Sequence, residues 1–125
     1  MTGKVKIRAL VAGGAGFIGS HLIDRLTQEG YKVLCVDNLV TGKEENIGHL
    51  KEWPGFRFIR HDITIPLTIE EDIHEIYNLA SPASPPQYQK NPVMTALTNV
   101  VGTKNLLDLA QEKGARFLQA SPSEV

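Results

Sequence analysis

The chain has 125 residues, of which 42% are hydrophobic and 22% charged, and its formal net charge is −1. This balance is typical of one globular domain and gives no support to nucleic acid or an acidic membrane as a partner. The single cysteine, Cys35, excludes an internal disulfide and lies in an apolar run, which favours a small core residue over a reactive thiol. His21, His49 and His74 show no metal-ligand spacing with one another or with Cys35, so no metal site is predicted. No apolar run can span a bilayer and the first residues lack a signal-peptide pattern, so we expect a cytoplasmic protein.

Apolar runs alternate with helical patterns along the chain. The predicted strands are 7–12, 32–36, 56–60, 75–79 and 116–120. A first helix is predicted over 17–29, with Gly30 as its stop, and we expect one of its faces to carry Ile18, Leu22 and Leu26. A second, longer helix has Asn91 as its cap and Pro92 at its first position, and it stops at Gly114. The polar segment 41–55 is predicted to be a loop with a short helix.

Strands separated by helices predict a parallel sheet with right-handed crossovers. The expected fold is therefore α/β, a Rossmann-type doubly wound sheet in three αβα layers with strand order 3-2-1-4-5. We interpret residues 1–125 as one dinucleotide-binding domain. Because the far edge of such a sheet is unpaired, we expect some tendency to self-associate.

A glycine-rich loop, Gly-Gly-Ala-Gly-Phe-Ile-Gly at 13–19, separates the first strand from the first helix. Gly14, Gly16 and Gly19 fit the spacing G-x-G-x-x-G, and Gly13 gives a second fit with the same last two glycines. Glycines here permit a tight turn and close approach of the backbone to a pyrophosphate, and the helix N-terminus offers unpaired N–H groups. Because the loop follows a strand and opens a helix, it favours a dinucleotide site over a turn without a ligand.

Asp37 lies at the end of the second predicted strand. A carboxylate at this place in a Rossmann fold accepts hydrogen bonds from the adenosine ribose hydroxyls and repels a 2′-phosphate. The first cation after it is Lys43, and no arginine is near to hold a 2′-phosphate, so the sequence favours NAD over NADP. The other interpretation is that Asp37 is a turn or cap residue.

Residues at the ends of the other strands extend the predicted site, because ligands of open α/β sheets bind outside the carboxyl ends of the strands. Asp62 can meet the adenine amino group while Ile63 packs on the ring, or it can be a plain loop aspartate. The small residues of 79–86 can lie along the nicotinamide and its ribose, or form a rigid connector. At the end of the chain, Ser123 can donate a hydrogen bond to a substrate and Glu124 can act as an acid or base.

Taken together, these residues resemble the extended short-chain dehydrogenase/reductase family, which is the NAD-dependent epimerase/dehydratase group, and in particular its nucleotide-sugar enzymes. The run Ser-Pro-Ala-Ser-Pro-Pro at 81–86 is most similar to the decarboxylases of UDP-glucuronate. The stretches that carry the resemblance are 13–22, 36–39, 41–42, 61–63, 78–86, 98–103 and 121–125. The resemblance covers essentially the whole chain, but only the N-terminal part of such an enzyme.

The resemblance implies an NAD site with four parts. The pyrophosphate is expected at Gly13, Gly16, Phe17, Ile18 and Gly19, and the adenosine ribose at Asp37, Asn38, Thr41 and Gly42. The adenine is expected at Asp62 and Ile63, and the rest of the NAD molecule along Leu79, Ala80, Ser81, Thr98 and Ala120. It also implies that Asn105 faces the substrate, a nucleotide sugar such as UDP-glucuronate. In the family, bound NAD oxidises the sugar at C4, the resulting β-keto acid loses carbon dioxide, and NADH reduces the ketone again. A homodimer is implied for a full-length form.

Three positions differ from the family pattern. No tyrosine here has a lysine four residues later, so the catalytic Tyr-x-x-x-Lys pair is missing from this chain. Pro122 stands where the family usually has a serine or threonine that bonds the sugar hydroxyl, and proline has no donor. Leu97 stands where the decarboxylases often have a lysine. We therefore expect NAD binding, with little activity of this chain alone, and interpret it as a truncated enzyme without its substrate domain.

Three functions remain open from the sequence. The first is the NAD-binding part of a UDP-glucuronate decarboxylase, which makes UDP-xylose. The second is another reaction of the family, 4,6-dehydration or C4 epimerisation of a nucleotide sugar, because the glycine loop and Asp37 are the same for all of them. The third is a non-catalytic NAD-binding module.

Overall fold

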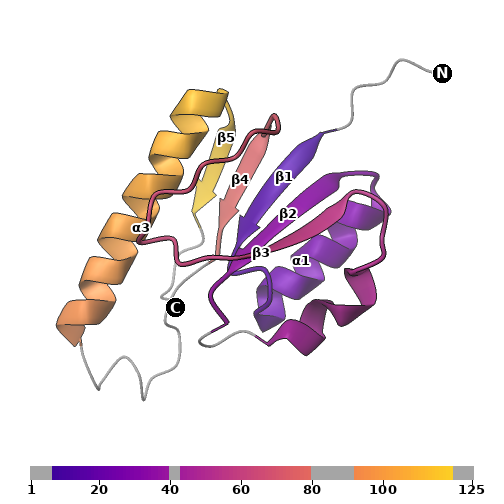
Figure 1. Cartoon of the computed structure of the whole chain (residues 1–125), viewed down its shortest axis with the longest axis horizontal. Helices are drawn as coiled ribbons and strands as arrows, with labels where there is room; N and C mark the ends of the chain where they lie inside the picture. Colours follow the sequence, from indigo (N-terminus) through magenta and orange to yellow (C-terminus); the bar gives the residue numbers. More distant parts are fainter. Residues whose placement is uncertain (1–6, 40–42, 80–91, 120–125) are drawn as a thin grey trace.

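The computed structural model of the chain is shown in Figure 1, and it describes residues 7–39, 43–79 and 92–119, with the backbone alone for 92–99. Five parallel strands form one sheet in the order β3-β2-β1-β4-β5. The strands are β1 (Arg8–Ala12), β2 (Lys32–Asp37), β3 (Phe56–Arg60), β4 (Glu75–Asn78) and β5 (Arg116–Gln119). The predicted doubly wound fold and its strand order are confirmed.

Helices cover both faces of the sheet and give it three layers (Figure 1). Helix α1 (Phe17–Gln28) and the 3-10 helix η1 (Glu44–Leu50) lie on one face, and α3 (Pro92–Lys113) lies on the other. The short helix predicted within 41–55 is therefore η1. Among the described helices, none combines the length and the apolar character that a membrane span requires.

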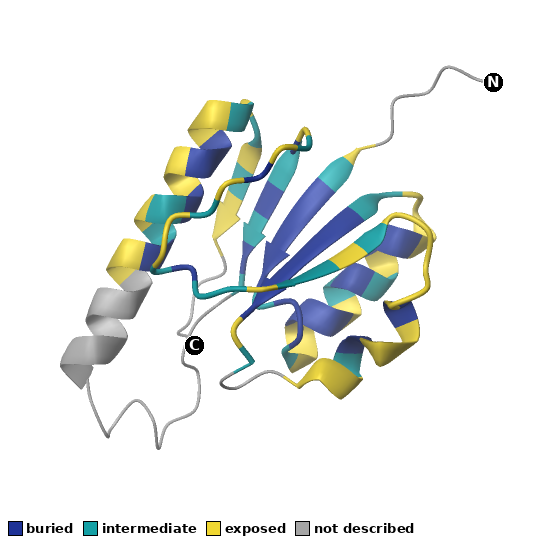
Figure 2. Ribbon diagram, in the orientation of Figure 1, coloured by how far each residue is buried: buried dark blue, intermediate teal, exposed yellow. Residues whose placement is uncertain are grey.

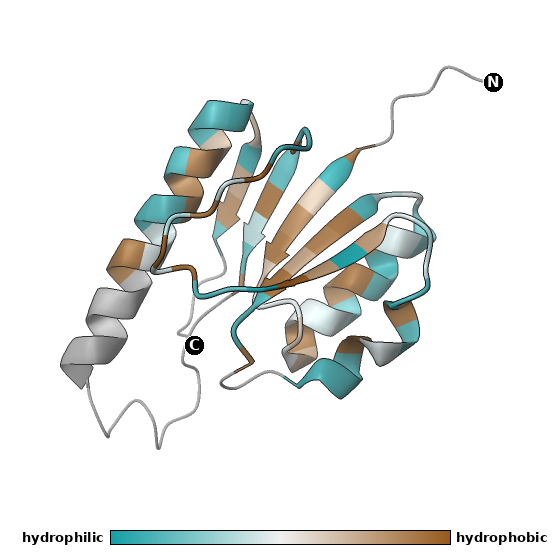
Figure 3. Ribbon diagram, viewed as in Figure 1, coloured by the Kyte–Doolittle hydropathy of each residue, from teal (hydrophilic) through white to brown (hydrophobic). Residues whose placement is uncertain are grey.

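Successive side chains of the central strands point to opposite faces of the sheet, so the core is divided into two clusters. In β1, Leu10 and Ala12 point to the face of α3, whereas Ala9 and Val11 point to the face of α1. Figures 2 and 3 show the result, with buried and apolar residues concentrated in β1 and β2. Strands covered on both faces give the near-continuous apolar runs from which they were predicted.

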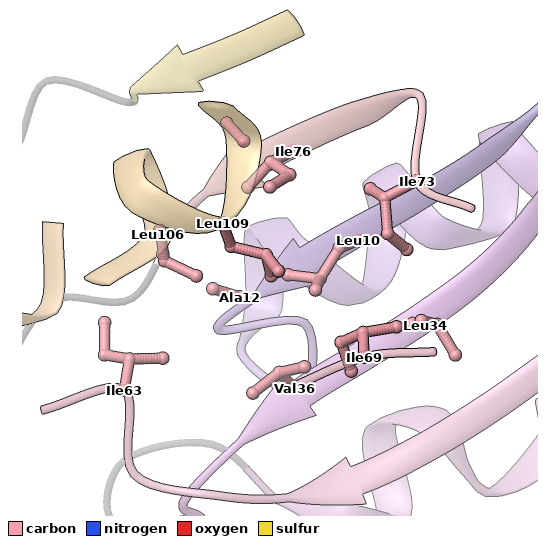
Figure 4. Packing of buried hydrophobic residues seen from close by; sticks show 11 residues of the cluster. Leu10, Ala12, Leu34, Val36, Ile63, Ile69, Ile73, Ile76, Leu106 and Leu109 are labelled. Carbon is pink, nitrogen blue, oxygen red and sulfur yellow. The ribbon is translucent and has the colours of Figure 1, made fainter. Parts of the chain in front are cut away.

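The core on the α3 face joins the helix to the long segment between β3 and β4. Leu106 and Leu109 of α3 pack against the sheet, and Ile63, Ile69 and Ile73 from that segment belong to the same cluster (Figure 4). This packing holds the residues after β3 against α3, so that Ile63 lies at the carboxyl end of the sheet beside the helix.

The face of α1 that is buried differs from the prediction. Ile23 and Leu26 are buried and Leu22 is partly buried, but Ile18 is 69% exposed. A helix turns by about 100° per residue, so a stripe centred on Ile23 and Leu26 leaves Ile18 on its border. Ile18 belongs instead to the first turn, which is open at the edge of the sheet.

Both helices end as predicted, at glycines in the left-handed region. Gly30 has φ +91° and follows α1, and Gly114 has φ +66° and follows α3. The N–H of Tyr31 returns to the carbonyl of Leu26, which satisfies a carbonyl of the last turn. Asn91, the expected cap of α3, lies outside the described residues.

Candidate dinucleotide-binding site

Four segments that follow strands meet at the carboxyl edge of the sheet. Backbone hydrogen bonds beyond the strand ends fix their register: Gly13 N to Val36 O at 2.7 Å, Leu79 N to Ala12 O at 2.8 Å, and His61 N to Asp37 O at 3.1 Å. The glycine loop, the end of β2, the start of the 61–74 segment and the residue after β4 are therefore neighbours. This is the edge at which open α/β sheets bind ligands.

The glycine loop turns directly from β1 into α1 because of two glycines at its ends. Gly13 has φ +80°, a conformation that side chains disfavour. A Cβ on Gly19 would lie 2.3 Å from the Gly13 carbonyl oxygen and 2.8 Å from the Gly14 Cα. The first turn of α1 therefore lies directly on the backbone of the loop, and Gly13 and Gly19 are required for that approach.

Cys35 lies beneath the same loop. A Cβ on Gly14 would be 2.5 Å from the Cys35 sulfur and 2.6 Å from Cδ1 of Ile23, so the loop rests closely on the core. Burial, with a further contribution from the carboxylate of Asp37, raises the pKa of the Cys35 thiol to about 12. The prediction of a core cysteine is confirmed, and its thiol stays protonated at neutral pH.

The N-terminus of α1 presents backbone donors that have no partner among the described residues. Its cap is Gly16, which has no side chain to offer, and no acidic residue lies in its first turn. Within the described part of the chain, the amides of Phe17, Ile18 and Gly19 donate no backbone hydrogen bond, whereas Ser20 N donates to Gly16 O at 2.9 Å. Unpaired amides and the positive end of the helix dipole suit an anion such as a pyrophosphate.

The Asp37 carboxylate joins the end of β2 to the glycine loop. Its Oδ2 accepts the amide of Ala15 at 2.9 Å, and its Oδ1 accepts the amide of Leu39 at 2.8 Å. The bond to Leu39 makes a tight turn in which Leu39 has φ +64°, a strained conformation for this residue. The turn role considered for Asp37 is thus present, and its contact with a ribose stays a prediction.

The carbonyl of Ala15, like its amide, is held by hydrogen bonds. It accepts Lys43 N at 3.0 Å and the side-chain amide Nδ2 of Asn46 at 2.8 Å. The sequence does not predict this role of Asn46, because the polar segment around it has no hydrophobic period and a single asparagine carries no signal of its own.

Asp62 and Ile63 lie where predicted, at the start of the segment after β3. Asp62 Oδ1 accepts the amide of Thr64 at 2.9 Å and its hydroxyl at 2.8 Å, which is a loop role. Ile63 is buried, and its carbonyl accepts Nδ2 of Asn105 at 2.7 Å. Asn105 therefore lies with the residues expected at the adenine, and its expected contact with a substrate stays a prediction. The adenine contacts of Asp62 and Ile63 also stay predictions.

The remaining predicted residues divide into two groups. Asn38 is exposed beside Asp37, and Leu79 is partly buried next to the glycine loop. The others lie outside the described residues, or, for Thr98, have a side chain that does: Thr41, Gly42, Ala80, Ser81, Thr98, Ala120, Ser123 and Glu124. Among the described residues, no group of His, Cys, Asp or Glu is arranged to hold a metal ion.

A model of the NAD dependent epimerase/dehydratase family matches residues 9–125. The chain belongs to this family. The family assigned from the sequence motifs is confirmed, and so is NAD as the cofactor of the family.

Known relatives add detail to the family assignment. The chain is 52% identical over 123 residues to UDP-glucuronic acid decarboxylase 1 of Arabidopsis thaliana, and 52% identical over 122 residues to UDP-glucuronic acid decarboxylase 1 of Danio rerio. Each match covers 98% of this chain, which spans 28% and 29% of the two relatives. A solved UDP-glucose-4-epimerase from Stenotrophomonas maltophila, with bound NAD and formylated UDP-arabinopyranose, has a TM-score of 0.80 at 29% identity. That match covers 92% of this chain and 37% of the epimerase.

The close approach at Gly19 gives a test of the loop geometry. We expect Gly19→Ala to lower the free energy of unfolding by about 1–3 kcal/mol, because the atoms that its Cβ meets are backbone and cannot rotate away. Gly48→Ala is the matched control, since nothing lies within 4 Å of a Cβ on this η1 residue. Urea unfolding measures both. Equal stability of the two variants would contradict the geometry.

Proposed function

We propose that this chain binds NAD at the carboxyl edge of its sheet. The pyrophosphate would lie on the amides of Phe17 and Ile18, and the adenosine ribose would lie beside Asp37. The observation that carries the proposal is the first turn of α1, whose backbone donors have no partner among the described residues and face no acidic side chain of that turn.

The carboxylate of Asp37 supports NAD over NADP. Each of its oxygens accepts one backbone amide, and a carboxylate oxygen has capacity for a second hydrogen bond, which a ribose hydroxyl can fill. A 2′-phosphate would bring a second negative charge to a carboxylate that is 8% exposed and already fixed in place. Asn38, Thr41 and Gly42 would complete the ribose site.

The other NAD contacts follow the order of the strands. Asp62 and Ile63 after β3 would hold the adenine. Within the described part of the chain, the contacts of Asp62 with Thr64 use Oδ1 and leave Oδ2 open. Residues after β4 and β5, together with α3, would line the nicotinamide half: Leu79, Ala80, Ser81, Thr98 and Ala120. When bound, NAD supplies the chemistry of removing a hydride from the sugar and returning it.

We further propose that the reaction of the whole protein is decarboxylation of UDP-glucuronate to UDP-xylose and carbon dioxide. The decarboxylase relatives from a plant and a fish support this, because each match covers 98% of the chain. C4 epimerisation is the second candidate, favoured by the fold similarity to a UDP-glucose-4-epimerase. Ser123 is the proposed hydrogen-bond donor to the substrate and Glu124 the proposed acid or base. A cytoplasmic homodimer is proposed for the full-length form.

This chain alone is proposed to bind NAD without turnover, since no tyrosine has a lysine four residues later. Tyr77 does not replace the missing pair. Its hydroxyl donates to Glu75 Oε1 at 2.8 Å at the amino end of β4, away from the glycine loop. Burial and the neighbouring Glu75 carboxylate raise the pKa of Tyr77 to about 12, the opposite of what a proton-transferring tyrosine needs.

Calorimetry with NAD and NADP tests the cofactor proposal on the chain itself. We expect NAD to bind at least about tenfold more tightly than NADP, because of the charge on Asp37. A folded chain that binds no NAD at millimolar concentration would overturn the proposal, and equal affinity for the two would remove the role of Asp37 in selectivity.

A chimera tests the reaction. In it, this chain replaces the matching 123 residues of the Arabidopsis decarboxylase, whose own remaining residues are kept. With UDP-glucuronate supplied, we expect UDP-xylose and carbon dioxide, with a higher rate in a second chimera carrying Pro122→Ser. The unaltered decarboxylase is the control. Folded, NAD-bound chimeras that form no UDP-xylose would refute decarboxylation, and a C4 epimer as product would favour the second candidate.

A further inference from the structure

The peptide unit that precedes α1 is held by hydrogen bonds at both its carbonyl and its amide. It joins the carbonyl of Ala15 to the amide of Gly16, which donates to the Gly13 carbonyl at 3.1 Å. On the carbonyl side, Lys43 N and Asn46 Nδ2 donate at 3.0 and 2.8 Å. The plane of this peptide is therefore set by contacts from the glycine loop and from η1.

Asn46 lies on a helix, η1, that is anchored to the core. Its own amide donates to the Lys43 carbonyl at 3.0 Å, and the next residue, Ile47, is completely buried in the core on the α1 face. Leu50 at the end of η1 is buried in the same cluster. The short helix is thus anchored to the core, and the Asn46 side chain reaches from it to the loop.

The orientation of this peptide matters for the amides that follow it. Phe17 and Ile18 come directly after Gly16, and the direction of their N–H groups depends on how the chain enters the helix. A donor that is already aimed at an anion avoids the cost of ordering the backbone when the anion binds. A contact that fixes the Ala15–Gly16 peptide therefore contributes to anion affinity without touching the anion.

We propose that Asn46 is a positioning residue for the pyrophosphate of the bound dinucleotide, acting through the Ala15 carbonyl on the first turn of α1. This inference rests on the proposed binding of NAD. It separates two roles at the site. Asp37 holds the Ala15 amide beside the ribose position, whereas Asn46 holds the carbonyl on the side of the helix.

A purely structural role for Asn46 makes a different prediction. If its hydrogen bond only attached η1 to the loop, its loss would lower the stability of the fold and weaken all ligands alike. A positioning role affects ligands that contain the pyrophosphate and spares those that do not. Comparing NAD and ADP-ribose with adenosine therefore distinguishes the two.

The experiment measures the affinities of the three ligands for the 125-residue chain and its variants by calorimetry. Asn46→Ala removes the hydrogen-bond donor, and Asn46→Leu removes it at similar side-chain size. A loss of affinity in both variants is therefore caused by the missing hydrogen bond and not by a cavity. Glu45→Ala, at the exposed neighbouring position on η1, is the matched control. Because Lys43 N still donates to the Ala15 carbonyl, we expect both Asn46 variants to fold, and circular dichroism checks this.

We expect NAD and ADP-ribose to bind about three- to tenfold more weakly to both Asn46 variants, the usual effect of one hydrogen bond, while adenosine changes by less than about twofold. Glu45→Ala should match the unaltered chain. Unchanged NAD affinity in a folded variant, or an equal loss for adenosine, would overturn the role of Asn46 and leave NAD binding intact. Failure of the unaltered chain to bind NAD would instead overturn the proposed function and this inference with it.

Discussion

The hydrogen bond from the Ala15 amide to the carboxylate of Asp37 connects the two strand ends on which the site depends. At 2.9 Å, between buried partners, it ties the glycine loop after β1 to the end of β2. A charged acceptor makes such a bond stronger than one between neutral groups, and losing either partner would leave a buried polar group unpaired. The side chain that holds the loop in shape is therefore also the one that we propose to favour NAD over NADP.

This constraint explains why the site is concentrated at one edge of the sheet. The parallel strands end together there, and α1 starts at once because Gly19 allows it to lie on the loop. On the other face, α3 packs on the segment after β3 through Leu106 and Leu109, and Asn105 holds the carbonyl of Ile63. The segments proposed to hold the pyrophosphate and the adenine are thus supported from opposite faces of one sheet.

Most of the fold could be predicted because its signals are local. The strands are apolar runs buried on both faces, and Gly30 and Gly114 mark helix ends through their own backbone preference. The predicted face of α1 was wrong at Ile18, which fits an apolar stripe by spacing but lies in the open first turn. Family motifs such as the glycine loop were sufficient to predict the family and its cofactor NAD.

What the sequence could not provide were the long-range contacts that shape the site. The sequence predicts Asp37 at a ribose or in a turn, and only the fold reveals that its carboxylate holds the glycine loop. Asn46 and Asn105 contact backbone carbonyls far along the chain, and such bonds depend on tertiary packing rather than on any spacing. Leu39 in a left-handed conformation is likewise a consequence of the Asp37 turn and not of its own preference.

From these contacts we infer that the glycine loop is ordered by the protein before any dinucleotide binds. Hydrogen exchange of the Ala15 amide, followed by NMR with and without NAD, tests it most directly. We expect this amide to exchange slowly in the chain alone and to stay slow with NAD, while the amides of Phe17 and Ile18 become protected only when NAD is present. An Ala15 amide that exchanges at the rate of an unstructured chain until NAD is added would contradict it.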